Sequence, residues 1–377
     1  MIMLKTILIL SLLVQAFQKS DVYFTKEMSS HKLVEMLQKL NLNLKGNIGL
    51  KAHSGERNGK YFLTPDFLQE IYDYTNGTFI ECNTAYSSQR SSSASHKNLL
   101  DQNNWTKNSR RTVIMDENPD DDIELTVENP QKISKNYVGA KIKDFDSVVV
   151  LSHFKGHQMG GFGGALKQLS IGFASQKGKT VIHTAGQHTE WRYAMSRAAN
   201  QIDFTSSMAD AASTIMNYFP KGQIGFVTVL ANISLSCDCA GSSAPAPRIH
   251  DIGILASTDP VAIDRACLDL IKSNVDTGTE DLLNQIKRLE GENTINVAEQ
   301  IGVGSQEYNL IEVEGKSDNG NGNNGNNNSD DKTNNDNNDP NDDDDEDEIS
   351  NLNGEFLRSK NLFGLNLCLK SLLILIL

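Results

Sequence analysis

A glycine-rich stretch that directly follows an apolar run is the feature that most limits what this chain can fold into. The run from Val148 to Leu151 predicts a buried strand. Residues 152–167, which come next, contain two histidines, two lysines and five glycines. Glycines let a backbone approach a ligand closely, and ligands bind beyond the carboxyl ends of strands in open α/β sheets. We therefore expect a ligand site in this segment; the alternative is a tightly packed turn without a ligand.

Two earlier strands end in the same way. Residues 47–51 and 77–84 predict short strands, and charged or polar side chains follow each of them. Strands that alternate with helices imply a mostly parallel sheet, whose carboxyl ends lie at one edge. The sequence thus predicts an α/β fold: a mostly parallel sheet flanked by helices, with polar strand-end loops that form one cleft.

Further elements follow from periodicity and from helix-start signals. Strands are expected at 21–25, 179–184, 224–235 and 251–257. Helices are expected at 32–40, 206–218 and 260–270, the last with Thr258 or Asp259 as its cap. Together these elements predict one α/β domain over residues 20–315.

The distribution of charge argues against nucleic acid as a partner. The chain of 377 residues has a net charge of -13, and much of this charge lies in the acidic run 342–348. No basic stripe suits a phosphate backbone. Residues 316–348 are rich in Asn, Asp and Gly and lack apolar periodicity, which predicts a disordered acidic stalk.

Both ends of the chain resemble targeting signals. Residues 1–16 combine one lysine with a short apolar run, which predicts a secretory signal peptide; the alternative is an uncleaved anchor helix. Residues 349–377 place polar residues before an apolar tail, as a glycolipid-anchor signal does; the alternative is a retained hydrophobic tail. We expect a protein of the secretory pathway, secreted or anchored at the cell surface, with membrane contact through this tail or a lipid anchor.

Four glycosylation sequons occur in the chain. Asn104 and Asn327 are the expected acceptors, whereas Asn232 falls within a predicted strand and is expected to stay unmodified.

The residues around the predicted cleft suit acid–base chemistry on a small anionic molecule. His157 and His153 belong to the residue type that titrates near neutral pH, so they are candidates for proton transfer or metal ligation. Lys167 can bind anionic oxygen, or act as a nucleophile if it is desolvated. These three are the candidate catalytic residues. The candidate ligand-binding residues are Lys51, Glu56, Asn83, Lys155, Gly161 and Gly164.

A Cys-x-Cys pair, Cys237 and Cys239, follows the strand predicted at 224–235. Thiolates bind soft or borderline metal ions, so both cysteines are candidate metal ligands. The alternatives are structural or redox-labile thiols, or a local disulfide, which an oxidising compartment would permit. The cofactor is left undetermined by these residues, with a metal ion or an iron–sulfur cluster as the candidates. The isolated Cys82 and Cys267 are expected to be buried apolar residues.

Several long motifs together resemble the DUF362 family, over about Val22 to Leu310. The motifs are Lys51-x-His53-Ser54-Gly55-Glu56, the strand end 81–86, the stretch 152–167, Cys237-Asp238-Cys239 and the run 251–262. Many members are identified as iron–sulfur proteins from ferredoxin-type cysteine runs. This chain has no such run. The resemblance therefore implies the fold of residues 22–310 and does not indicate which reaction the protein performs.

A shorter pattern is similar to one in the lactate racemase (nickel-pincer) family. It reads His157-x3-Gly161-Phe162-x-Gly164-x2-Lys167. In that family the lysine holds the cofactor covalently and the histidine moves a proton, so the resemblance implies these roles for Lys167 and His157.

Two functions follow as hypotheses. The first is a metal- or cofactor-binding cleft that performs redox or isomerase chemistry on a small anionic ligand. The second is a non-catalytic surface binding protein that retains the fold without a cofactor.

Overall fold

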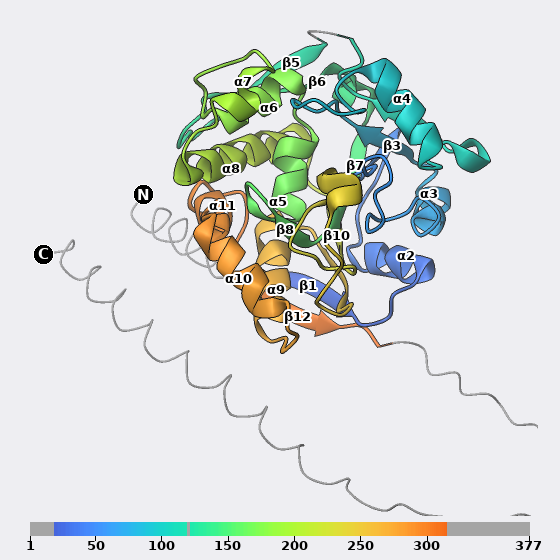
Figure 1. Cartoon of the computed structure of the whole chain (residues 1–377). Helices are drawn as coiled ribbons and strands as arrows, with labels where there is room; N and C mark the ends of the chain where they lie inside the picture. The colour runs from blue at the N-terminus through green and yellow to red at the C-terminus, as the bar shows by residue number, and fades with distance from the viewer. Residues whose placement is uncertain (1–18, 119–120, 315–377) are drawn as a thin grey trace, which may run out of the picture. The chain divides into compact units, whose positions relative to one another are not determined.

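The computed structural model describes residues 19–118 and 121–314. Among these residues, eight strands form one sheet in the order β12-β1-β11-β10-β7-β2-β3-β4. Figure 1 shows the paired strands β12 and β1 side by side. Every neighbouring pair in the sheet is parallel except the two pairs that contain β11. The strands are β1 (Ser20–Thr25), β2 (Ile48–Lys51), β3 (Thr78–Glu81), β4 (Thr112–Ile114), β7 (Ser147–His153), β10 (Ile224–Leu230), β11 (Gly253–Ser257) and β12 (Tyr308–Glu312). The mostly parallel α/β fold expected from the sequence is confirmed.

Helices cover both faces of this sheet, so its central strands are buried on both sides. Side chains of β7 alternate between two apolar clusters. Val148 and Val150 pack in one cluster, with residues of α8 (Gln201–Tyr218) and α9 (Pro260–Lys272). Val149 and Leu151 pack in the other, with residues of α2 (Ser30–Lys39) and α3 (Gln69–Thr75). This alternation is the two-residue period of a strand.

The helices and the small sheets complete the domain. The helices are α2 (Ser30–Lys39), α3 (Gln69–Thr75), α4 (Ser93–Gln102), α5 (Ala165–Lys167), α6 (Gln176–His183), α7 (Tyr193–Ser196), α8 (Gln201–Tyr218), α9 (Pro260–Lys272), α10 (Thr279–Arg288) and α11 (Gly291–Gln300). Two antiparallel pairs lie outside the main sheet: β5 (Asp122–Thr126) with β6 (Lys135–Gly139), and β8 (Lys155–His157) with β9 (Gly161–Gly163). Ser29 caps α2, and Asp259, one of the two caps expected for this helix, caps α9.

Two expectations about individual elements are wrong. Residues 179–184 were expected to form a strand, but they lie at the end of α6, which is capped by the Ser175 side chain. Their apolar members Val181 and Ile182 pack against α8, and this tertiary contact outweighs the strand preference of β-branched residues. β10 ends at Leu230 and not at residue 235. Asn232 consequently lies outside the strand and is exposed, so strand burial does not protect its sequon.

Several expectations concern residues outside the described part of the chain. These are the signal peptide at 1–16, the stalk at 316–348 with Asn327, and the tail at 349–377. Within the described residues, no helix has the length and apolar character needed to cross a membrane. Asn104 is exposed, as a glycan acceptor must be.

Candidate functional site

A cavity of about 240 Å³ lies at the carboxyl ends of β2 and β3. Its lining comes from the residues after these strands, from the β8–β9 hairpin, from α5 and from α6. This is the edge of a parallel sheet at which ligands bind. Strand-end loops that are far apart in the sequence therefore meet at one cavity, as the strand pattern predicts.

The lining carries an excess of positive charge. Four of the lining residues are basic and one is acidic. The basic residues are Lys51, Arg90, Lys167 and Lys179, and the acidic residue is Glu81. Three histidines also line the cavity, and burial lowers the pKa of each one: His53, His157 and His183. These histidines are therefore uncharged at neutral pH. A small anion is the ligand that such a lining stabilises.

Lys167 differs from the other basic groups of the cavity. Lys51 and Lys179 donate to backbone carbonyl groups, and Arg90 is paired with carboxylates. Among the described residues, no hydrogen-bond or ion-pair partner engages the Lys167 ammonium. Its pKa is lowered to about 8, first by burial and then by the charge of Arg90. Both protonation states are thus accessible near neutral pH, as proton transfer requires.

A buried carboxylate fixes the segment that carries Lys167. Asp264, on α9, accepts the backbone N–H groups of Ala165 and Leu166 at 2.7 and 3.0 Å. These N–H groups begin α5 and have no partner inside the helix. Burial raises the pKa of Asp264 to about 7. A Cβ atom on Gly164 would overlap this carboxylate, so the glycine is needed for packing.

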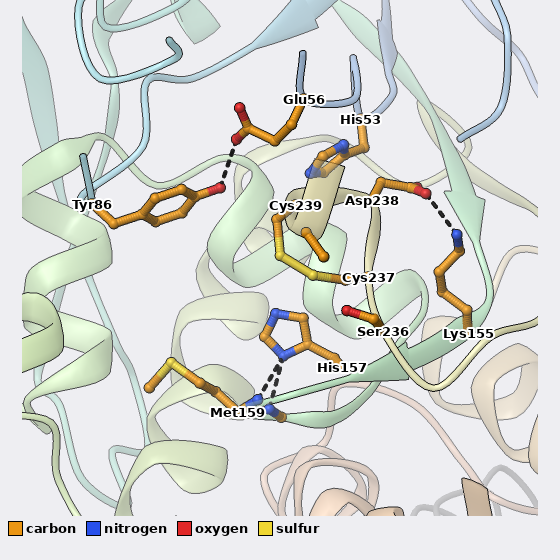
Figure 2. The surroundings of a disulfide bond; sticks show 12 residues. His53, Glu56, Tyr86, Lys155, His157, Met159, Ser236, Cys237, Asp238 and Cys239 are labelled. Carbon is orange, nitrogen blue, oxygen red and sulfur yellow. Dashed lines mark hydrogen bonds and ion pairs between the residues drawn. A yellow bond between two sulfur atoms is a disulfide. The ribbon is translucent and has the colours of Figure 1, made fainter. Parts of the chain in front are cut away.

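Arg90 is held in place by two carboxylates. Its Nε donates to Glu56 Oε1 at 2.9 Å, and its Nη1 donates to Glu81 Oε2 at 3.3 Å. The Tyr86 hydroxyl also donates to Glu56, at 2.9 Å (Figure 2). Although burial alone would raise the pKa of Glu81, Lys51 and Arg90 hold it below its usual range. Glu56 and Glu81 therefore fix the guanidinium beside the cavity.

The backbone sets the tautomer of His157. The N–H groups of Met159 and Gly160 both donate to His157 Nδ1, at 3.2 and 2.9 Å (Figure 2). Because Nδ1 accepts, the proton of the neutral ring is on Nε2, and that nitrogen can only donate. In this state His157 is a hydrogen-bond donor and not a base.

His153 and Lys155 are both paired with Asp238. His153 Nδ1 lies 3.0 Å from Asp238 Oδ2, and its Nε2 lies 2.6 Å from the carbonyl oxygen of Ala231. Both of these neighbours accept, so both ring nitrogens carry hydrogen and the ring is charged. Lys155 donates to the other carboxylate oxygen of Asp238 at 2.7 Å (Figure 2). Neither His153 nor Lys155 lines the cavity, and both instead anchor the turn that begins at Asp238.

Cys237 and Cys239 are joined by a disulfide (Figure 2). Cys239 lines the cavity and Cys237 does not. The two sulfurs and a ring nitrogen of His157 all lie within 4.8 Å of one another, which is the spacing of a metal site. Neither sulfur is a thiolate while the disulfide is intact. The predicted metal binding by these cysteines thus applies only to the reduced protein.

The described residues do not suit an iron–sulfur cluster, which is held by four ligands, either cysteines alone or cysteines with histidines. Cys82 and Cys267 are buried free thiols, as the sequence predicts. Cys82 donates to the carbonyl oxygen of Phe173 at 3.3 Å, and Cys267 packs in the apolar core. Neither thiol joins the group formed by His157 and the disulfide.

Two further predicted ligand residues belong to the framework. The Asn83 side-chain amide donates to Ser93 Oγ and to the Asp116 carbonyl oxygen, both at 2.9 Å. Gly161 has a φ of +77° and packs against Gly291. Neither Asn83 nor Gly161 lines the 240 Å³ cavity. The predicted site residues that do line it are Lys51, His157, Lys167 and Cys239.

Several residues of the site, including His53, Glu81 and Arg90, were not among the predicted site residues. Lys179 and His183 line the cavity from α6, four residues apart and so on the same face of the helix. Their signal was the cap Ser175 followed by this helical spacing, which an expected strand at 179–184 concealed. Asp238 and Asp264 have no comparable signal, because their partners are 83 to 99 residues away in the sequence.

Comparison with known proteins identifies a family. A family model described as "Domain of unknown function (DUF362)" matches residues 48–269. No curated protein matches the chain. The chain is similar to solved structures, including the lactate racemase apoprotein from Thermoanaerobacterium thermosaccharolyticum, with 13% identity and a TM-score of 0.39 over 64% of this chain and 55% of that one. A protein from Thermotoga maritima shows 12% identity and a TM-score of 0.37, over 72% and 58% of the two chains.

The chain spans 55% and 58% of the lengths of these two structures. The family model, in contrast, covers more than half of the chain and includes β2, β3, β7 and the whole cavity lining. This chain belongs to DUF362, a family defined by a domain of unknown function.

Proposed function

We propose that this protein is an enzyme that binds a small anionic molecule in the cavity and moves a proton to or from it, as isomerases do. The observation that carries the proposal is the Lys167 ammonium, which has no protein partner among the described residues. The positive lining would stabilise the negative charge that develops when a proton is abstracted from an anionic substrate.

The residues of the cavity divide into two roles. Arg90, fixed by Glu56 and Glu81, would stabilise the anionic group of the substrate through its positive charge. Lys167, whose pKa is lowered to about 8, would accept the proton as an amine and return it as an ammonium.

His157 would assist as a donor. Its Nδ1 accepts two backbone hydrogen bonds, so its Nε2–H can donate to a developing oxyanion. A neutral histidine that donates in this way polarises a carbonyl group without having to give up its proton.

We also propose that the enzyme acts in the secretory pathway. The disulfide between Cys237 and Cys239 supports this location, because disulfides persist in oxidising compartments and are rare in the cytosol.

The test uses the full-length protein and a panel of small carboxylates in D₂O. Proton transfer replaces an exchangeable C–H by C–D, which proton NMR detects without knowledge of the complete reaction. Binding of the same compounds is measured by calorimetry. Lys167→Met is compared with Lys107→Met, which removes an exposed lysine outside the cavity.

We expect the native protein and Lys107→Met to bind at least one carboxylate and to exchange its proton. Lys167→Met should bind it about 10- to 100-fold more weakly, since a hydrogen bond to a charged group is worth about 1.5–3 kcal/mol, and should not catalyse exchange. Binding without exchange in the native protein would support the non-catalytic binding protein instead. No binding by any small anion would overturn both readings.

A further inference from the structure

The proton-transfer proposal makes no use of the disulfide at the cavity wall. Its two cysteines differ in access. Cys239 is half-buried and lines the cavity, whereas Cys237 is 7% exposed and does not line it. A nucleophile that enters the cavity therefore meets Cys239 and not Cys237.

The surroundings of this disulfide favour sulfur anions. Lys167 and Arg90 line the same cavity as Cys239. A ring nitrogen of His157 lies within 4.8 Å of both sulfurs. Figure 2 shows the Nδ1 edge of that ring turned toward Met159, with the rest of the ring on the side of the disulfide. Positive charge and N–H donors stabilise thiolates, which are the reactive species in disulfide exchange.

We infer that the Cys237–Cys239 disulfide exchanges with small anionic thiols that enter the cavity, and that Cys239 is the attacked sulfur. The thiolate of the ligand forms a bond to Cys239 Sγ while the bond to Cys237 breaks, and the electron pair leaves on Cys237 as a thiolate. One disulfide replaces another, so the step needs no external oxidant or reductant. The inference rests on the proposed function in one respect, because the preference for an anionic thiol comes from the positive lining.

The experiment begins with the full-length protein prepared without reductant. Treatment with iodoacetamide should leave Cys237 and Cys239 unmodified. The protein is then incubated with mercaptoacetate, which carries a carboxylate, or with the neutral 2-mercaptoethanol. Free thiols are trapped with N-ethylmaleimide, and the modified residues are mapped by mass spectrometry. Cys267, a buried free thiol, serves as an internal control and should remain unmodified.

We expect mercaptoacetate on Cys239 and maleimide on Cys237. Per thiolate, mercaptoacetate should react at least about tenfold faster than 2-mercaptoethanol, since a charged cleft concentrates ions of the opposite sign. Lys167→Met should reduce this preference, whereas Lys107→Met should keep it.

The possible failures are distinct. Adducts on Cys237, or no adduct with either thiol, would overturn the inference even if calorimetry finds carboxylate binding, and the proposed function would stand. Alkylation of both cysteines before any thiol is added would also overturn it, and would direct the search to a metal bound by the reduced pair. Equal rates for the two thiols at Cys239 would retain the exchange and contradict the anion site.

Discussion

Replacing Asp238 by asparagine should strongly destabilise the folded protein. The Asp238 carboxylate lies 3.0 Å from His153 Nδ1 and 2.7 Å from Lys155 Nζ, and the three side chains are 6%, 3% and 2% exposed. The substitution keeps the shape of the side chain and removes its negative charge. Two buried cations then lack a counter-charge, which is among the most destabilising changes that a single substitution can cause.

The size of the effect follows from these distances. At an effective dielectric constant of about 20, each contact contributes about 6 kcal/mol of attraction. The variant also avoids the desolvation of the carboxylate, which offsets several kcal/mol of that loss. The two attractions, about 12 kcal/mol together, less a desolvation cost of several kcal/mol, give an upper bound. We expect a decrease in the free energy of unfolding of about 3–5 kcal/mol, the range found when one partner of a buried pair is removed.

The assay is urea unfolding of the full-length protein at pH 7, followed by fluorescence of the buried Trp105. Glu312→Gln is the matched control, because it removes a carboxylate from an exposed pair with Lys26 at 4.0 Å, with side chains 62% and 79% exposed. That control should change stability by less than about 0.5 kcal/mol. A loss below about 1 kcal/mol in Asp238→Asn would refute the view that Asp238 balances His153 and Lys155.

The same variant has a signature in pH. Although burial acts in the opposite direction, His153 and then Lys155 hold the pKa of Asp238 below its usual range. A carboxyl with a lowered pKa stabilises the fold above the unfolded-state value of about 3.9 and loses this effect as the pH falls. The difference in stability between native protein and Asp238→Asn should therefore be full at neutral pH and should shrink below about pH 4.

Four further results are expected. Affinity for a small carboxylate should fall as the pH rises through about 8, because the Lys167 ammonium loses its charge there; calorimetry from pH 6 to 10 measures it. Gly164→Ala should lower the free energy of unfolding by about 1–3 kcal/mol, because the added Cβ would overlap the Asp264 carboxylate. Gly163→Ala, whose Cβ would meet Lys167 Cδ at 3.6 Å and the His153 carbonyl oxygen at 4.0 Å, both ordinary contacts, should stay within about 0.5 kcal/mol of the native protein in the same urea titration. The pKa of Asp264 is about 7 in the folded protein and about 3.9 in the unfolded chain, so the free energy of unfolding should decrease as the pH rises from about 4 to 7. Asp264→Asn should lack this pH dependence. Asn104→Gln should abolish one mobility shift caused by endoglycosidase treatment of protein secreted from eukaryotic cells, and an unchanged shift would exclude a glycan at Asn104.

The sheet was predictable because its signals are local. The run at 148–151 is buried on both faces in β7, and Asp259 with Pro260 starts α9 as its residue types predict. The prediction of a strand at 179–184 was wrong because Val181 and Ile182 favour strands locally. The sequence alone does not show that they pack against α8. This one error also hid the helical spacing of Lys179 and His183.

The site was harder to predict for a different reason. The sequence does not show which charged side chains are already paired with another residue of the protein. His153, Lys155 and Lys167 belong to one sixteen-residue stretch, and nothing in that stretch separates them. Asp238, about 85 residues further along the chain, engages the first two and leaves the third. Lys167 is therefore available to a ligand because His153 and Lys155, and not Lys167, are paired with Asp238. The Asp238 and Lys167 variants test this division directly: the first should lower stability with the cavity lining intact, and the second should lower ligand affinity with little effect on folding.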